Sequence, residues 1–170
     1  MKKVIVGIDP GQKGAIAIIR EGLPLEVYDL KPCYKPTGSF NSLDPERLYH
    51  LILRSIPQLH EGVAVFCEES QLRHGNGIKT ARPIYDSRGT MRTLLWLRKN
   101  ELTYIQPQTW KRKFGLLKQD KFASCEKASE LFPKSKHLFW KQHGKRELPL
   151  DGRAEAALIA HYGWLLDRAD

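Results

Sequence analysis

The stretch that decides the fold is Val4-Ile-Val-Gly-Ile-Asp9-Pro-Gly11, an apolar run that ends at a carboxylate and a turn. β-Branched residues favour strands, and Asp-Pro-Gly is typical of a turn that ends one. A second apolar run follows at Ala15–Arg20, and Leu25–Leu30 alternates like a third strand. Three short runs joined by glycine-bearing connections predict an antiparallel meander.

Beyond the meander, helices alternate with strands. Asp44-Pro45-Glu46 indicates a helix start, because Asp caps helices and Pro suits the first helical position. Val63–Glu68 is predicted as a buried strand, and Gln71–Pro83 as a polar, basic loop. The remaining segments are a loop over Lys31–Asn41, a strand over Thr103–Gln106, a basic, poorly periodic stretch over Lys134–Leu150, and helices over about Ile84–Lys99, Gln108–Phe114, Lys121–Leu131 and Asp151–Arg168.

This order of elements predicts an α/β fold, a mixed five-stranded sheet flanked by helices. We find no internal repeat and no second boundary, so we expect one domain over residues 1–170.

The charge balance favours a polyanionic partner. There are 28 Lys and Arg residues against 19 Asp and Glu, a formal net charge of +9, and nucleic acid is the commonest partner of such chains. No apolar run is long enough to span a bilayer and no signal peptide is visible, so we expect a cytoplasmic protein without a membrane partner. The three cysteines, Cys33, Cys67 and Cys125, are too widely spaced to indicate a disulfide framework or a zinc site.

Four carboxylates stand out by position. Asp9 ends the first strand, Glu68 ends the fourth, and Asp151 and Glu155 share one face at the start of the last helix. If the first and fourth strands are neighbours, Asp9 and Glu68 meet at one edge of the sheet, where ligands gather in α/β folds. Each residue also has a purely structural interpretation: a turn former, an ion-pair partner, a helix cap and a first-turn acid, respectively.

Clustered carboxylates repel one another, and a cation removes that penalty. Hard oxygen ligands suit Mg²⁺ or Mn²⁺, and two such ions can activate a water and stabilise the leaving oxygen of a phosphodiester. A basic protein with a cluster of carboxylates that can bind divalent cations is therefore predicted to be a nuclease.

These residues resemble the RuvC family of Holliday-junction resolvases over nearly the whole chain. The opening strand looks like the family's first catalytic strand, Phe66-Cys-Glu68-Glu-Ser70 like its second, and Asp151-Gly-Arg-Ala-Glu155 like its C-terminal acidic helix. Ser87-Arg88-Gly89 resembles the start of the helix that forms the family's dimer interface. The motifs closest to the plant chloroplast resolvase branch are Gln108-Thr-Trp110-Lys111-Arg, Leu131-Phe-Pro133 and Gly152-Arg-Ala-Glu155.

The resemblance implies an RNase H-like fold and a Mg²⁺-dependent crossover junction endodeoxyribonuclease of bacterial or phage origin. It would act as a homodimer on four-way junctions and make paired symmetric nicks with two ions, Mn²⁺ substituting, held by Asp9, Glu68, Asp151 and Glu155. The resemblance is also compatible with a branch-migration helicase as a partner. The sequence departs from bacterial RuvC at three positions. Glu155 stands where that protein has Asp, and Asp151 precedes it by four residues instead of three. Gln71 stands where that protein has an aromatic wedge.

Basic residues follow the acids along the chain. Lys111 and Lys121 match functional lysines near the scissile phosphate in the family, Lys118 matches one in the chloroplast branch, and we expect Lys118 and Lys121 to be catalytic. An outer contact to a DNA arm is expected from Lys134, Lys136, Lys141, Lys145 and Arg146. The expected DNA-binding residues are Arg73, Lys79, Arg82, Arg88, Lys111, Arg112, Lys113, Lys118 and Lys121.

Two alternatives stay open: another RNase H-like nuclease that cuts branched DNA or RNA–DNA hybrids, and a junction-binding protein without catalysis. The presence of all four acids argues against the second. An actin-like ATPase or sugar kinase, which shares the Gly-Ile-Asp-Pro-Gly strand, needs a second phosphate-binding domain for which the chain is too short.

Overall fold

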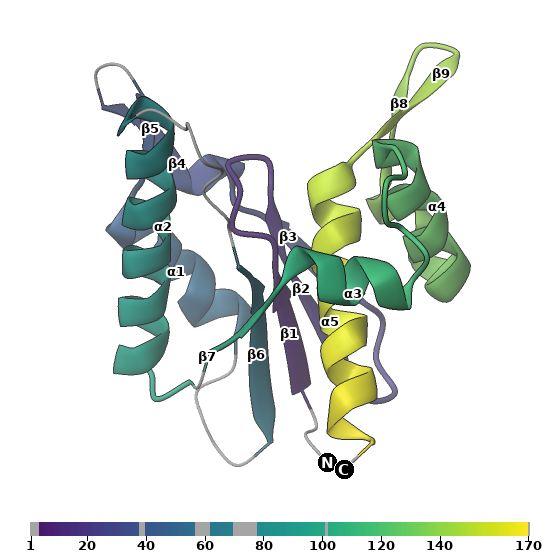
Figure 1. Cartoon of the computed structure of the whole chain (residues 1–170), viewed down its shortest axis with the longest axis horizontal. Helices are drawn as coiled ribbons and strands as arrows, with labels where there is room; N and C mark the ends of the chain where they lie inside the picture. The colour runs from purple at the N-terminus through teal and green to yellow at the C-terminus, as the bar shows by residue number, and fades with distance from the viewer. Residues whose placement is uncertain (1–3, 38–39, 57–61, 70–77, 101, 170) are drawn as a thin grey trace.

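The chain folds around one mixed sheet with helices on both faces (Figure 1). This computed structural model describes residues 4–37, 40–56, 62–69, 78–100 and 102–169, with the backbone alone at 37, 40, 78–84 and 121. The sheet order is β3-β2-β1-β6-β7, with β6 parallel to β1 and β7 and the other pairs antiparallel. The predicted α/β fold with a mixed five-stranded sheet is thereby confirmed. Its strands are β1 (Val4–Ile8), β2 (Ala15–Arg20), β3 (Glu26–Asp29), β6 (Val63–Glu68) and β7 (Leu102–Ile105).

The helices divide between the two faces of this sheet, as Figure 1 shows. One face carries α1 (Pro45–Ser55) and α2 (Ile78–Leu97), and the other carries α5 (Asp151–Asp167) with α3 (Pro107–Lys113) and α4 (Lys121–Leu131) beside it. Each face has its own hydrophobic cluster, so the sheet is buried on both sides. None of the helices in the described ranges is long and apolar enough to cross a membrane.

Helix α5 packs closely on the sheet because one residue of β1 has no side chain. Alternate residues of β1 face opposite sides: Ile5 packs in the cluster under α5, and Val6 and Ile8 in the other. Gly7 has no side chain, and a Cβ there would lie 2.2 Å from the backbone nitrogen of Ala160 and 2.3 Å from the carbonyl oxygen of Ala156. The helix therefore lies directly on the backbone of β1.

Two hairpins were not expected from the sequence. The prediction of a loop over Lys31–Asn41 was wrong, because a 3₁₀ turn and two antiparallel strands occupy that region. A second hairpin occupies the stretch that showed no periodicity, and it projects beyond the body of the molecule (Figure 1). The elements are η1 (Lys31–Cys33), β4 (Tyr34–Thr37), β5 (Phe40–Leu43), η2 (Pro133–Leu138), β8 (Trp140–His143) and β9 (Arg146–Pro149).

The start of α2 also differs from the prediction. We expected a loop over Gln71–Pro83 and a helix from about Ile84; residues 71–77 lie outside the described part, and residues 78–83 belong to α2, which runs through the proline. Proline lacks the N–H that would bond four residues back, so the helix continues at the loss of one backbone hydrogen bond.

Candidate active site

Two parallel strands deliver the first two carboxylates to the same edge of the sheet. Asp9 follows the last residue of β1, and Glu68 is the last residue of β6. Ile8 is paired in register with Cys67, so Asp9 and Glu68 occupy corresponding positions on adjacent strands. The first and fourth strands are therefore neighbours, which was the condition for Asp9 and Glu68 to meet, and their ends lie where ligands bind in such sheets.

The first turn of α5 brings Asp151 and Glu155 to this edge. A Cβ on Gly152 would lie 2.0 Å from the carbonyl oxygen of Lys13, so only glycine lets this turn sit against the backbone that follows Asp9. Between the two acids, Arg153 donates from Nε and Nη2 to the Asp29 carboxylate on β3, at 2.6 and 2.7 Å. This bidentate pair anchors the helix start to the sheet.

The four carboxylates act on one another electrostatically. Burial raises the pKa of Asp9 to about 7, and the charges of Glu155, Glu68 and Asp151 add to this effect, while the Gly11 N–H opposes it. Burial likewise raises the pKa of Glu68, with Glu155 as the next contribution. The structure therefore places all four predicted acids in one electrostatic cluster, which we call the acid cluster (Asp9, Glu68, Asp151 and Glu155).

Helices α3 and α4 supply donors to this cluster. Trp110 donates its indole N–H to Glu68 Oε2 at 2.9 Å, and Lys111 Nζ forms an ion pair with Glu155 Oε1 at 3.0 Å. Ser124 Oγ lies 3.4 Å from the same Glu155 oxygen and donates to it. Trp110 lies within the Gln108–Arg112 motif, but neither its contact with Glu68 nor that of Ser124 with Glu155 was predicted from the sequence.

Glu69, directly after Glu68, belongs to a different network. Its carboxylate accepts a hydrogen bond from Gln106 and pairs with Arg88 Nη2 at 3.5 Å. Arg88, one of the expected DNA contacts, also lies 4.8 Å from the centre of the Tyr104 ring and is half-buried. The two adjacent acids at the end of β6 therefore have separate partners, and Glu68 is the one that interacts with Asp9 and Glu155.

The donor set of the acid cluster suits a hard divalent cation. Four carboxylates, one with a pKa near 7 because of burial and like charge, would all be stabilised by a positive ion. Within the described part of the chain, no three His, Cys, Asp or Glu side chains converge closely enough to hold an ion as they stand. The chemistry of the residues fits a cation, although the described side chains do not surround one as placed and Lys111 pairs with Glu155.

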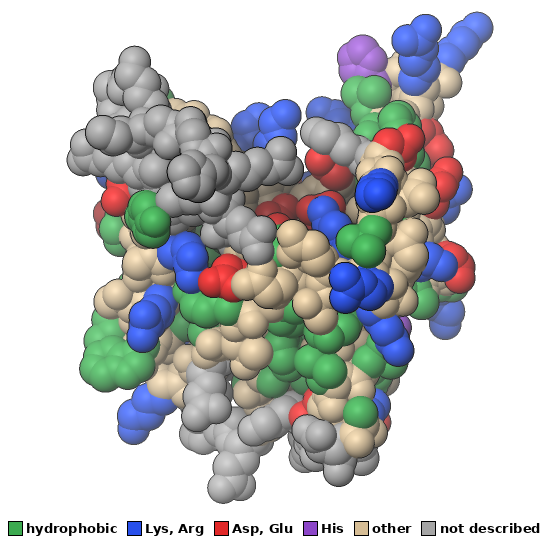
Figure 2. Space-filling view, in the orientation of Figure 1, with side chains coloured by type: hydrophobic (Ala, Val, Ile, Leu, Met, Phe, Trp, Pro, Cys, Tyr) green, Lys and Arg blue, Asp and Glu red, His purple; other side chains and the backbone are tan. Residues whose placement is uncertain are grey.

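The structure describes the side chains of only some of the basic residues expected to bind DNA. Arg112 and Lys113 are exposed on α3, and Lys118 is exposed in the turn after it with φ at 62°, in the left-handed region uncommon for lysine. Lys79, Arg82 and Lys121 lie on helices, but their side chains are outside the described part, as are Arg73 and Gln71 altogether. Figure 2 shows acidic atoms in the hollow between the two flanks of the molecule, with Lys and Arg around it.

The raised pKa of Asp9 predicts how stability depends on pH in EDTA. Because the folded-state pKa is about 7 against an ordinary 3.8, the folded state holds this proton more tightly than the unfolded chain. The resulting stability is complete below about pH 4 and is lost as pH rises through 7, on the order of 2 kcal/mol since water reaches part of the group.

Urea midpoints at pH 5 and pH 8 measure this loss, and Asp9→Asn isolates it. Burial lowers the pKa of His161, which acts in the opposite direction and is present in both proteins. We expect wild type to lose more stability than the variant between the two pH values. An equal change in both proteins would show that Asp9 titrates normally.

Comparisons with known proteins place the fold. No protein-family profile matches the sequence, and no curated protein matches it. The structure of T. thermophilus RuvC in complex with Holliday junction substrate superposes with a TM-score of 0.58 and 14% identity, covering 98% of this chain and 96% of that one. A second Thermus thermophilus RuvC structure gives a TM-score of 0.56 and 16% identity over 96% of both chains. At these identities the likeness establishes architecture, so the chain has a RuvC-like fold.

Proposed function

We propose that this protein is a divalent-metal-dependent endonuclease that resolves four-way DNA junctions. The observation that carries the proposal is the acid cluster, in which parallel strands and the α5 N-terminus bring four carboxylates together on a basic protein. The RuvC-like fold supports it, because one protein that shares the fold was solved with Holliday junction substrate. Within that fold, the Gln108–Arg112 and Gly152–Glu155 motifs lead us to group the chain with the chloroplast branch.

In this proposal Asp9, Glu68, Asp151 and Glu155 hold two Mg²⁺ ions, with Mn²⁺ able to substitute. The ions would supply an activated water and a stabilised leaving oxygen. Burial of Asp9 and Glu68 limits the access of bulk water to the strand ends, which strengthens the interaction of these carboxylates with any cation. Lys111, paired with Glu155, lies next to the reacting region and can turn to a phosphate oxygen when a cation takes its place.

The DNA interface in the proposal surrounds the acid cluster. Arg112, Lys113 and Lys118 are exposed on and after α3, and we propose that Lys118 and Lys121 approach the scissile phosphate. The β8–β9 hairpin carries exposed Lys141, Lys145 and Arg146 and projects from the body of the molecule (Figure 1), and we propose that it contacts a DNA arm. We further assign Arg73, Lys79, Arg82 and Arg88 to the same interface. Phosphate contacts of this kind weaken steeply with salt.

A cleavage assay tests the proposal. The protein is incubated with labelled four-way junction, Y-fork, linear duplex or RNA–DNA hybrid, each in Mg²⁺, Mn²⁺ or EDTA. We expect metal-dependent nicks in the junction only. Equal cutting of forks or hybrids would assign the protein to a broader class of RNase H-like nuclease. Tight junction binding without cutting under any metal would overturn the catalytic assignment.

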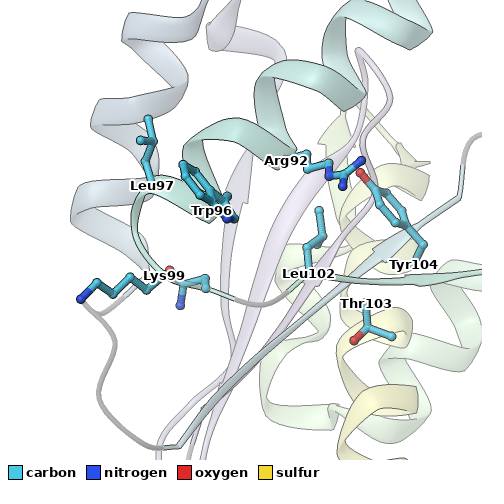
Figure 3. Close-up of a pocket in the computed structure, with 8 residues that line it drawn as sticks. Arg92, Trp96, Leu97, Lys99, Leu102, Thr103 and Tyr104 are labelled. Carbon is cyan, nitrogen blue, oxygen red and sulfur yellow. The ribbon is translucent and has the colours of Figure 1, made fainter.

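We also propose that two copies pair through the exposed face of α2. Tyr85 and Trp96 are 60% and 72% exposed on this helix, and a Cβ on Gly89 between them would meet nothing within 4 Å. Trp96 lies at the rim of a cavity of about 850 Å³ between the end of α2 and β7, together with Arg92 (Figure 3). Large exposed aromatic side chains on a monomer indicate an interface, and a two-fold dimer suits symmetric cleavage.

Trp96→Glu should therefore weaken self-association about 30-fold or more, as loss of an interface hot spot does. Sedimentation equilibrium across micromolar concentrations measures this. Leu23→Glu is the matched control, because Leu23 is 61% exposed in the turn between β2 and β3, away from α2. If both variants associate as wild type does, the interface lies elsewhere.

A further inference from the structure

Trp110 makes an unusual contact for a core side chain. It is fully buried in the cluster under α5, yet its one polar atom, Nε1, donates to Glu68 Oε2 at 2.9 Å across 42 residues of sequence. A tryptophan needed only for packing can fill such a position without reaching a carboxylate. Here the ring is fixed by the core, so the direction of its N–H is fixed as well.

This contact differs in kind from the neighbouring one on Glu155. Lys111 brings a positive charge to Glu155, and that charge competes with any cation for the carboxylate. The indole N–H is neutral, so it orients Glu68 without cancelling the negative charge, and it occupies only Oε2.

We propose that Trp110 is a positioning residue that fixes the Glu68 carboxylate for binding a divalent cation, leaving Oε1 available as the ligand. The inference rests on the proposed function, since it assigns a cation to the acid cluster. Helix α3 would then act on two of the four carboxylates through adjacent residues, Trp110 on Glu68 and Lys111 on Glu155. Donors that orient a ligand typically raise metal affinity about 10–100-fold.

Calorimetric titration with Mg²⁺ and Mn²⁺ tests this role in wild type, Trp110→Phe and Trp140→Phe. Phenylalanine keeps a buried ring but removes the N–H. Trp140 is the matched control, because its indole N–H also makes a side-chain hydrogen bond, 3.0 Å to Ser129 Oγ, outside the acid cluster. We expect affinity to fall about 10–100-fold in Trp110→Phe and to stay within about threefold of wild type in Trp140→Phe.

A second readout uses the indole N–H resonances of ¹⁵N-labelled wild-type protein, one for each of the four tryptophans. Phenylalanine variants of Trp96, Trp140 and Trp164 assign the Trp110 resonance by elimination, so the test survives if Trp110→Phe does not fold. We expect the Trp110 resonance to move most on addition of Mg²⁺, and to move without metal in Glu68→Gln, because the acceptor loses its charge.

These experiments distinguish failure of the positioning role of Trp110 from failure of the proposed metal-dependent function. If wild type binds the ion but Trp110→Phe binds it equally well, or the Trp110 resonance does not respond, the positioning role is wrong and the proposed nuclease stands. If wild type binds neither ion and no indole resonance moves, both the positioning role and the metal-dependent function are overturned.

Discussion

Asp9→Asn should reduce junction cleavage by on the order of a thousandfold while leaving junction binding in place. Asp9 is the carboxylate on which the other three act, and its burial makes it the cluster member most in need of a cation. A metal site supplies several kcal/mol to the transition state, and each 1.36 kcal/mol is tenfold in rate. The amide keeps the size of the side chain but loses its charge. Single-turnover cleavage in Mg²⁺, beside an electrophoretic binding assay in EDTA, measures both quantities.

Glu69→Gln is the matched control for this loss. Glu69 lies next to Glu68 on the chain but is paired with Arg88 and Gln106 rather than with the acid cluster. We expect its cleavage rate to stay within about tenfold of wild type, since a partly exposed pair contributes little. Equal losses in the two variants, or full activity in Asp9→Asn, would contradict the assignment of the site.

Gly7→Ala should destabilise the protein by about 3 kcal/mol or more. The added Cβ would lie 2.2–2.3 Å from backbone atoms of Ala160 and Ala156, and backbone cannot rotate away as a side chain can. Relief requires α5 to move off β1, and overpacking of this kind costs about 1–3 kcal/mol and occasionally more. Because α5 also carries Asp151 and Glu155, cation affinity should fall along with stability.

Urea denaturation gives the stability change, with Gly89→Ala as its control. A Cβ at Gly89, inside α2, would meet nothing within 4 Å, and alanine suits a helix better than glycine. That variant should be as stable as wild type or slightly more stable. A Gly7→Ala protein with a wild-type midpoint would mean that α5 does not rest on β1 as described.

The elements that the sequence predicted well are those whose local pattern matches their burial. Val63–Cys67 is apolar because β6 is covered on both faces. Asp44 caps α1, where its Oδ1 accepts from the backbone N–H groups of Glu46 and Arg47. The β8–β9 hairpin has mostly exposed residues on both faces, so no alternation marks it. For β4 and β5, prolines and a glycine obscured the pairing.

The site residues were predictable from the sequence only in part. The four acids sit at or near the ends of elements, which marked them as candidates, but that β1 and β6 are neighbours was seen only in the structure. Trp110 and Ser124 reach the cluster through contacts that span 42 and 31 residues, which no local pattern encodes. Gly7 and Gly152 were visible in the sequence, but their need for close approach appears only when α5 is seen against β1 and the turn after it.

The most direct test of the account uses a supercoiled plasmid that extrudes a cruciform, a four-way junction within a closed circle. Two symmetric nicks made during one binding event convert the circle to a linear product, whereas independent nicks leave an open circle first. We predict Mg²⁺-dependent linear product, with the two cuts at symmetric positions across the junction, from wild type but not from Asp9→Asn. Open circles alone, or cuts unrelated to the cruciform, would contradict the proposal that this protein resolves junctions.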